Sequence, residues 1–166
     1  MMKSIKREVR ILGLDSCGRR LVGIVSRGGL YLDGAITFRN ITETAGVELA
    51  RNVRGTKYFP ELKAIMIHDP EALLNLESLA RITGLPILVA PDRLKRFDKS
   101  FRVLQSDHGR LSTSTETESS VTHEMLMEIW TVGKLPEPIR IAHLLSRLPA
   151  GRGSRGGSVG SSAVLA

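Results

Sequence analysis

Short apolar runs separated by polar turns dominate the first part of the chain. They span residues 9–15, 21–26 and 30–38, and they carry β-branched residues and few charges. Such runs are typical of strands that are buried on both faces of a sheet. Gly18 can adopt the positive φ that the first turn needs. The pair Gly28-Gly29 is typical of the tight turn in an antiparallel hairpin. The pattern therefore predicts an antiparallel meander of three strands.

Between residues 42 and 91 the pattern alternates between helix and strand. The predicted elements are a helix over 42–54, a strand over 63–68, a helix over 69–84 and a strand over 86–91. Asp69 fits the N-cap of the second helix, and Pro70 fits its first helical position. A strand, a helix and a strand in this order predict a parallel βαβ unit.

The chain after Pro91 has a weaker pattern. Apolar residues at helical spacing predict another helix; they are Leu94, Phe97, Phe101 and Leu104. Residues 106–120 are rich in Ser and Thr, which predicts a mobile loop or an irregular hairpin. Short helices are expected over 123–130 and over 139–148.

The domain organisation follows from composition. The hydrophobic fraction of 42% and the charged fraction of 25% are ordinary for a globular chain, and 166 residues suffice for one core. From Gly151 onwards the chain is rich in Gly and Ser, which predicts a flexible tail. We therefore expect one domain over 1–150 and a tail over 151–166.

The net charge of +7 is concentrated near both ends of the sequence. Residues 1–27 hold seven Lys or Arg against two acids, and residues 140–155 hold four Arg and no acid. A basic surface attracts nucleic acid and other polyanions, although it can also be only a solvated face. The candidate phosphate-binding residues are Arg19, Arg20, Arg96, Arg152 and Arg155.

The compartment is predicted from cysteine use and hydropathy. Cys17 is the only cysteine, so an intrachain disulfide is impossible, which fits a reducing compartment. The sequence lacks both a signal-peptide pattern and an apolar run approaching the ~20 residues of a membrane helix. We expect a cytoplasmic protein without a membrane partner.

Acidic residues and one histidine occur in or at the ends of the predicted strands. Asp15 ends the first strand, Asp33 lies in the third, and His68 and Asp69 end the fourth. If the first strand lies beside the fourth, Asp15 and His68-Asp69 meet at one edge of the sheet. Gathered carboxylates bind Mg²⁺ or Mn²⁺, and such an ion can activate water.

Each of these residues also has a structural interpretation. Asp15 can simply start a turn, Asp33 can pair with an arginine, and Asp69 can cap the helix that follows it. His68 can ligate a metal ion, whereas His123 and His143 lack the short spacing to a partner that zinc sites usually show. The apolar neighbours of His143 predict a part-buried histidine. Neither a phosphate-binding glycine loop nor a GxSxG elbow occurs.

The order of several sequence blocks resembles one family. The blocks are ILGLDS, VGIVSRGGLYLDG, KAIMI, TGLPILVAPD, EPIRIAHLLSR and GRGSRG. Over roughly residues 5–157 they resemble the archaeal endonuclease V homologue family, whose function is uncharacterised. The resemblance implies an α/β, ribonuclease-H-like fold. Its mixed sheet has five strands, with strands one to three antiparallel, strands four and five parallel to the first, and helices on both faces.

The resemblance also implies a candidate active site. Endonuclease V enzymes cut nucleic acid near deaminated bases, using Mg²⁺ held by acids at the ends of strands one and four and by one acid between them. Asp15 matches the first acid, and Glu43 is the nearest candidate for the acid between. His68 stands where the acid of strand four is expected, and Asp69 stands where a glycine is expected. Histidine suits Mn²⁺ or Zn²⁺ better than Mg²⁺.

These observations predict a divergent endonuclease-V-like protein that binds DNA or RNA and has an altered or lost nuclease site. The candidate catalytic residues are Asp15, Glu43, His68 and Asp69, and the candidate metal ligands are Asp15, Asp33 and Asp69. The ion would be Mg²⁺ or Mn²⁺, or the site would hold none. The alternative is a non-catalytic module that binds a polyanion or an acidic protein partner.

Overall fold

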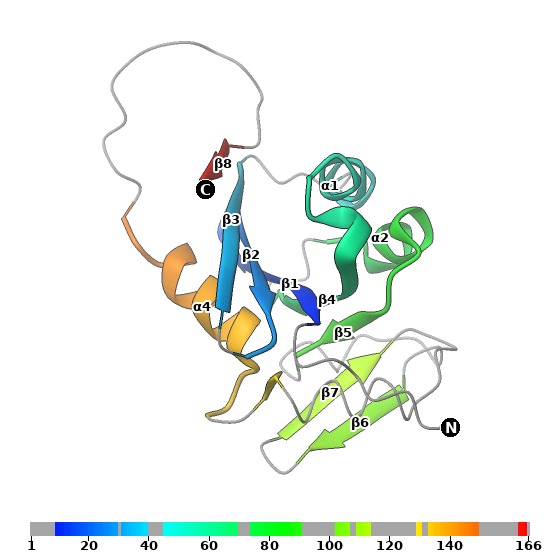
Figure 1. Ribbon diagram of the computed structural model, residues 1–166, viewed down its shortest axis with the longest axis vertical. Helices are drawn as coiled ribbons and strands as arrows, with labels where there is room; N and C mark the ends of the chain where they lie inside the picture. The colour runs from blue at the N-terminus through cyan, green and yellow to red at the C-terminus, as the bar shows by residue number, and fades with distance from the viewer. Residues whose placement is uncertain are drawn as a thin grey trace.

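A mixed β-sheet forms the centre of the protein, with helices on both faces (Figure 1). The computed structural model describes residues 9–29, 31–39, 45–69, 74–90, 102–106, 109–113, 129–130, 133–149 and 163–165. Within these residues the strand order is β6-β7-β5-β4-β1-β2-β3-β8. The helices α1 (Ala45–Arg54) and α2 (Leu76–Thr83) cover one face, and α4 (Glu137–Ser146) covers the other.

The strand directions confirm the predicted core of the sheet. The strands are β1 (Arg10–Cys17), β2 (Arg20–Arg27), β3 (Tyr31–Arg39), β4 (Leu62–His68), β5 (Ile87–Val89), β6 (Arg102–Ser106), β7 (Gly109–Thr113) and β8 (Ala163–Leu165). β1, β2 and β3 form the antiparallel meander. β4 is parallel to both β1 and β5. The α/β class and the five-stranded mixed arrangement were therefore predicted correctly, and β6, β7 and β8 extend the sheet.

Side chains along β1 alternate between the two faces of the sheet, as in any strand. Leu12 packs in the core that α1 and α2 cover, whereas Ile11 packs beside Ile139 of α4. The same alternation turns Asp15 towards α4 and Ser16 towards the opposite face. Because side chains alternate along the strand, Asp15 can contact α4 and Ser16 cannot.

The contact between β1 and α4 depends on a glycine. A Cβ atom at Gly13 would lie 2.4 Å from the carbonyl carbon of Pro138, which is far inside van der Waals contact. Pro138 belongs to the first turn of α4, where proline is well tolerated because the amide hydrogens there have no partner within the helix. The bare backbone of Gly13 therefore lets the start of α4 lie directly on β1.

The predicted start of the second helix was wrong. α2 begins at Leu76, and its N-cap is Asn75, whose side chain accepts a hydrogen bond from the Ser78 amide at 3.0 Å. Asp69 is therefore not the helix cap. Asn and Asp are about equally good caps, so the local pattern alone did not separate the two positions.

Replacing Asn75 by alanine should lower the free energy of unfolding by about 1 kcal/mol, because one amide of the first turn loses its acceptor. Urea unfolding monitored by circular dichroism measures the change. Asn52→Ala, inside α1, is the matched control and should change stability little. If Asp69 capped the helix instead, Asn75 would be an interior position and alanine there would stabilise the protein slightly.

The helix predicted after Pro91 was wrong for its last residues, and residues 91–101 lie outside the described part of the chain. Residues 102–106 form β6, which pairs antiparallel with β7 and places Ser106 opposite Gly109. The hairpin, one of the two alternatives for the Ser/Thr-rich segment, is confirmed as far as residue 113. β7 also pairs with β5, so pairing to the sheet edge overrides the helical spacing of a short apolar run.

The predictions for the C-terminal part of the chain can be compared with α4 and β8. The helix predicted over 139–148 is confirmed as α4 and begins slightly earlier, at Glu137. Ala163–Leu165 pairs with β3 as β8, so this part of the expected flexible tail is a strand. Most of the helix expected over 123–130 lies outside the described residues. Among the helices that are described, none has the length and hydropathy to span a bilayer.

Candidate functional site

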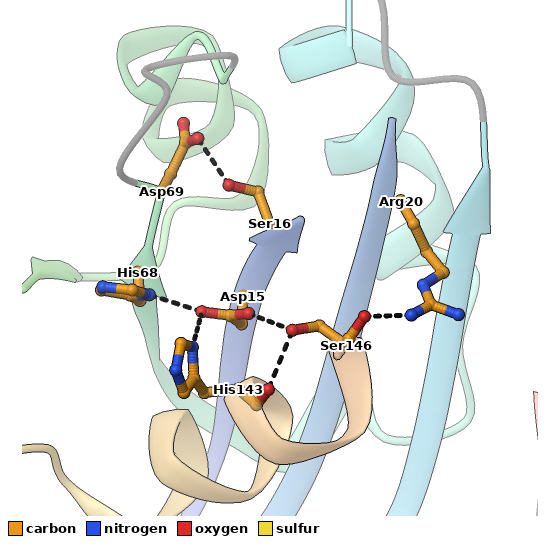
Figure 2. A network of polar contacts seen from close by, with 7 residues as sticks. All are labelled: Asp15, Ser16, Arg20, His68, Asp69, His143 and Ser146. Atoms are coloured by element: carbon orange, nitrogen blue, oxygen red, sulfur yellow. Dashed lines mark hydrogen bonds and ion pairs between the residues drawn. The ribbon is translucent and has the colours of Figure 1, made fainter. Parts of the chain in front are cut away.

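Asp15 and His68 meet at one edge of the sheet, where β1 and β4 both end. The two strands run parallel, and their register places Asp15 directly beside His68. His68 Nδ1 lies 2.5 Å from Asp15 Oδ1, and both residues are buried, at 1% and 6% exposure. The sequence prediction that these strand ends would be neighbours is therefore correct (Figure 2).

α4 brings two more side chains to the same carboxylate (Figure 2). His143 Nδ1 lies 3.1 Å from Asp15 Oδ1, and the hydroxyl of Ser146 donates a hydrogen bond to Asp15 Oδ2. Residues three apart on a helix lie on the same face, so His143 and Ser146 reach Asp15 together. The imidazole rings of His68 and His143 meet edge to face, with centroids 5.2 Å apart.

The electrostatics of the cluster favour an ionised carboxylate. Burial is the largest single influence and by itself would raise the pKa of Asp15. The hydrogen bonds from His68, Ser146 and His143, with the nearby charge of the His68 ring, together outweigh burial, so the pKa lies below its ordinary value. An ionised carboxylate only accepts hydrogen bonds. Both imidazoles therefore present Nδ1–H to Asp15.

Arg20 fixes the end of α4 rather than projecting into solvent. Its guanidinium donates hydrogen bonds to the carbonyls of Ser146 and of Leu148, the latter at 2.7 Å. The last carbonyls of a helix lack intrahelical donors and carry negative partial charge. Arg20, which was predicted to bind phosphate, holds in this structure the turn from which Ser146 reaches Asp15.

Asp69 belongs to a separate contact on the other face of the sheet. The Ser16 hydroxyl donates to Asp69 Oδ1 at 2.8 Å, and the Leu74 amide donates to Asp69 Oδ2 at 2.9 Å. Adjacent residues of a strand point to opposite faces, so the residue after His68 cannot share an ion with Asp15 from the same side. The predicted pairing of Asp69 with Asp15 is not found.

Asp33 lies at the opposite end of the sheet from Asp15. Its carboxylate is 2.6 Å from Arg10 Nε and 3.2 Å from Arg27 Nη2. Arg10 begins β1, about 17 Å from Asp15 at the rise of an extended strand. The arginine pairing that the sequence offered as the alternative is therefore present, and Asp33 is not a ligand in the Asp15 cluster.

The other predicted site residues have different outcomes. Arg19 is described and exposed, in the turn between β1 and β2. Those outside the described residues are Glu43, Arg96, Arg152, Arg155 and His123.

Sequence reasoning missed the roles of His143 and Ser146. The only signal for them was the spacing of three residues along an expected helix, which says nothing about which strand the helix crosses.

The resemblance implies Mg²⁺, and the donor set provides a direct test of that expectation. The only group of potential ligands within the described residues consists of Asp15, His68 and His143, whose ligand atoms lie within 4.8 Å of one another. Mg²⁺ prefers oxygen ligands in octahedral geometry. One carboxylate and two imidazoles do not satisfy that preference, so these residues do not fit Mg²⁺.

Comparison with known proteins identifies relatives across most of the chain. A UPF0215 protein of Methanothermobacter thermautotrophicus is 27% identical, and the alignment covers 87% of this chain and 89% of the relative. A UPF0215 protein of Thermococcus gammatolerans is 25% identical, with 88% and 94% covered. The homologues of this chain are archaeal UPF0215 proteins of unknown function. No family model matches the chain.

One solved structure shares the fold. A protein of unknown function from Archaeoglobus fulgidus matches with a TM-score of 0.64, covering 82% of this chain and 95% of that protein. Their sequences are 21% identical, so the likeness supports a common architecture. This structure therefore supports the α/β fold.

Proposed function

We propose that this protein is a ribonuclease-H-like, nucleic-acid-binding relative of endonuclease V whose nuclease site is altered and does not cleave with Mg²⁺. The observation that carries the proposal is the surroundings of Asp15. Its carboxylate lies at the strand end where the resemblance expects a catalytic acid, and its neighbours are His68 and His143.

The proposed loss of Mg²⁺-dependent cleavage rests on the ligands. A magnesium-dependent nuclease needs carboxylate oxygens gathered around the ion. Both oxygens of Asp15 instead accept hydrogen bonds from protein groups, and Asp69 is turned to the opposite face. A single buried carboxylate competes poorly with water for Mg²⁺.

Nucleic-acid binding is supported by the charges near the same edge. Arg19 and Arg147 are both exposed. They flank the contact in which Arg20 holds the end of α4, so two exposed guanidinium groups lie close to the Asp15 edge. Guanidinium groups bind phosphate oxygens through paired hydrogen bonds, and the net charge of +7 attracts a polyanion over longer distances.

Binding can be tested with labelled single-stranded and duplex DNA and RNA, by fluorescence anisotropy between about 50 mM and about 200 mM salt. Affinity should fall steeply with salt. Arg19→Gln and Arg147→Gln should each weaken binding and reduce the slope of log affinity against log salt by about 1.

Arg81→Gln provides the matched control for the binding experiment. Arg81 is exposed in the last turn of α2, which leads into the start of β5 and therefore lies towards the opposite edge from Asp15. Its replacement should leave the slope unchanged. Affinity that ignores salt, or equal losses in all three variants, contradicts binding at the Asp15 edge. Salt-dependent binding of an acidic protein but not of nucleic acid would favour the interaction-module alternative.

Cleavage is tested separately, with inosine- and uracil-containing DNA and RNA in the presence of Mg²⁺. We expect intact substrate after incubation with the wild-type protein. Mg²⁺-dependent cleavage that disappears in Asp15→Asn would overturn the proposed loss of activity.

A further inference from the structure

We propose that Asp15, His68 and His143 form a binding site for one divalent transition-metal ion of the Mn²⁺ to Zn²⁺ series. This inference does not depend on nucleic-acid binding. It starts from the chemistry of the three side chains. Two imidazole nitrogens and one carboxylate oxygen are donors that suit Zn²⁺ and related ions, and they come from three different elements, β1, β4 and α4.

The distances leave room for such an ion after a small movement. Asp15 Oδ1 lies 2.5 Å from His68 Nδ1 and 3.1 Å from His143 Nδ1. Ligand atoms about 2.0–2.1 Å from a tetrahedral ion lie about 3.3 Å from one another. The ion would take the place of the hydrogens that now lie between the carboxylate and the rings. Each neutral imidazole would then carry its proton on Nε2.

The surrounding contacts hold the three donors in position before any ion arrives. Ser146 binds Oδ2 of Asp15, which leaves Oδ1 directed at the two rings (Figure 2). Arg20 in turn holds the carbonyl of Ser146. Partners of this kind, which orient a ligand without touching the metal, usually change metal affinity 10- to 100-fold in other proteins.

The three donors are buried to different extents, and the most exposed of them marks the side from which an ion could enter. Asp15 and His68 are almost fully buried, whereas the His143 side chain is 25% exposed. Among the described residues the cluster offers three protein donors, so a tetrahedral ion keeps one position for water, on the side of His143. The hydrogen bonds of Asp15 now offset the cost of burying its charge. A cation bound at the same place would offset that cost instead.

The experiment uses the full chain, freed of metal with a chelator, and measures Zn²⁺ binding by calorimetry and Co²⁺ binding by visible absorption. We expect one ion per chain and the intense absorption that is typical of tetrahedral Co²⁺. Mg²⁺ at the same concentration should not compete. His68→Ala and His143→Ala should each lower Zn²⁺ affinity by more than about 100-fold, and Ser146→Ala by about 10- to 100-fold.

Controls separate loss of the site from loss of the fold. Asp33→Asn is the control for Asp15→Asn, because it makes the same chemical change at the other end of the sheet. The Asp33→Asn protein should bind Zn²⁺ as the wild type does. Trp130 fluorescence and circular dichroism verify that each variant is folded, and His143→Gln provides a milder replacement at the most exposed donor. The proposal fails if the wild type binds neither Zn²⁺ nor Co²⁺, or if folded His68 and His143 variants bind as well as the wild type. A loss of only about tenfold in Asp15→Asn would remove Asp15 from the ligand set and overturn the three-ligand assignment.

Discussion

Replacing Gly13 by alanine is expected to destabilise the protein by about 3 kcal/mol, the upper part of the range for overpacked cores. The new Cβ would lie 2.4 Å from the carbonyl carbon and 2.5 Å from the carbonyl oxygen of Pro138. These are backbone atoms, so they cannot rotate away as the tip of a side chain can. α4 must therefore move off β1, and His143 and Ser146 move with it.

Urea unfolding followed by Trp130 fluorescence measures this effect well. Trp130 is the only tryptophan, and it packs in the same cluster as Ile139 of α4. Gly23→Ala is the matched control, because the nearest atoms to its new Cβ would be side-chain atoms of Leu14, Leu12 and Ile36, at 3.1 Å or more. We expect that variant to lose less than about 1.5 kcal/mol. Equal losses in both variants would show that the β1–α4 contact is not specially tight.

Replacing Asp15 by asparagine is expected to lower the free energy of unfolding by about 1–3 kcal/mol at neutral pH in metal-free protein. Asparagine is uncharged and has one acceptor oxygen, so it cannot accept hydrogen bonds from His68, His143 and Ser146 on two oxygens as the ionised carboxylate does. Asp33→Asn at the far end of the sheet is again the chemical control, since it removes ion pairs without changing this cluster.

The loss in Asp15→Asn should depend on pH in a defined direction. The pKa of Asp15 in the folded protein lies below its ordinary value of 3.8, so the unfolded chain takes up this proton at higher pH than the native protein does. The stabilisation is therefore fully present above pH 3.8 and is lost as the pH falls through the lower native pKa. Urea titrations of wild type and variant from neutral pH into this acid range should show a narrowing difference. A difference that stays constant or widens contradicts the assigned charge state.

The sheet and half of the cluster could be predicted because they depend on local pattern and strand order. The short apolar runs around residues 11, 24 and 65 give strands whose side chains are buried on both faces, and the strand–helix–strand order predicts that β4 is parallel to β5. β1 has eight residues and β4 has seven, and the parallel register between them places Asp15 beside His68. That β1 lies beside β4 was a condition of this prediction, and the family resemblance implied it.

The other half of the cluster depends on where a distant helix lands. His143 and Ser146 meet Asp15 only because α4 crosses β1 at Gly13. A glycine in a predicted strand does not show which helix will pack against it. The wrong prediction for Asp69 has a similar cause. Asn75 caps α2, and the Asp69 carboxylate instead accepts a hydrogen bond from Ser16 of a distant strand. A distant contact also decides β6, because only pairing through β7 with the sheet edge selects strand over helix for residues 102–106.

The hydrogen bonds of Asp15 have a consequence for the order of events during protein synthesis. The carboxylate belongs to β1, the first of the described strands along the chain, yet two of its donors follow 128 and 131 residues later. Chains fold progressively from the N-terminus as they are made, and contacts between distant residues wait for the loop between them to close. Until α4 docks, the face of the nascent sheet that it will cover stays exposed to water, and the Asp15 carboxylate is hydrated there instead of accepting hydrogen bonds from His143 and Ser146. The cluster therefore closes only after α4 has been synthesised.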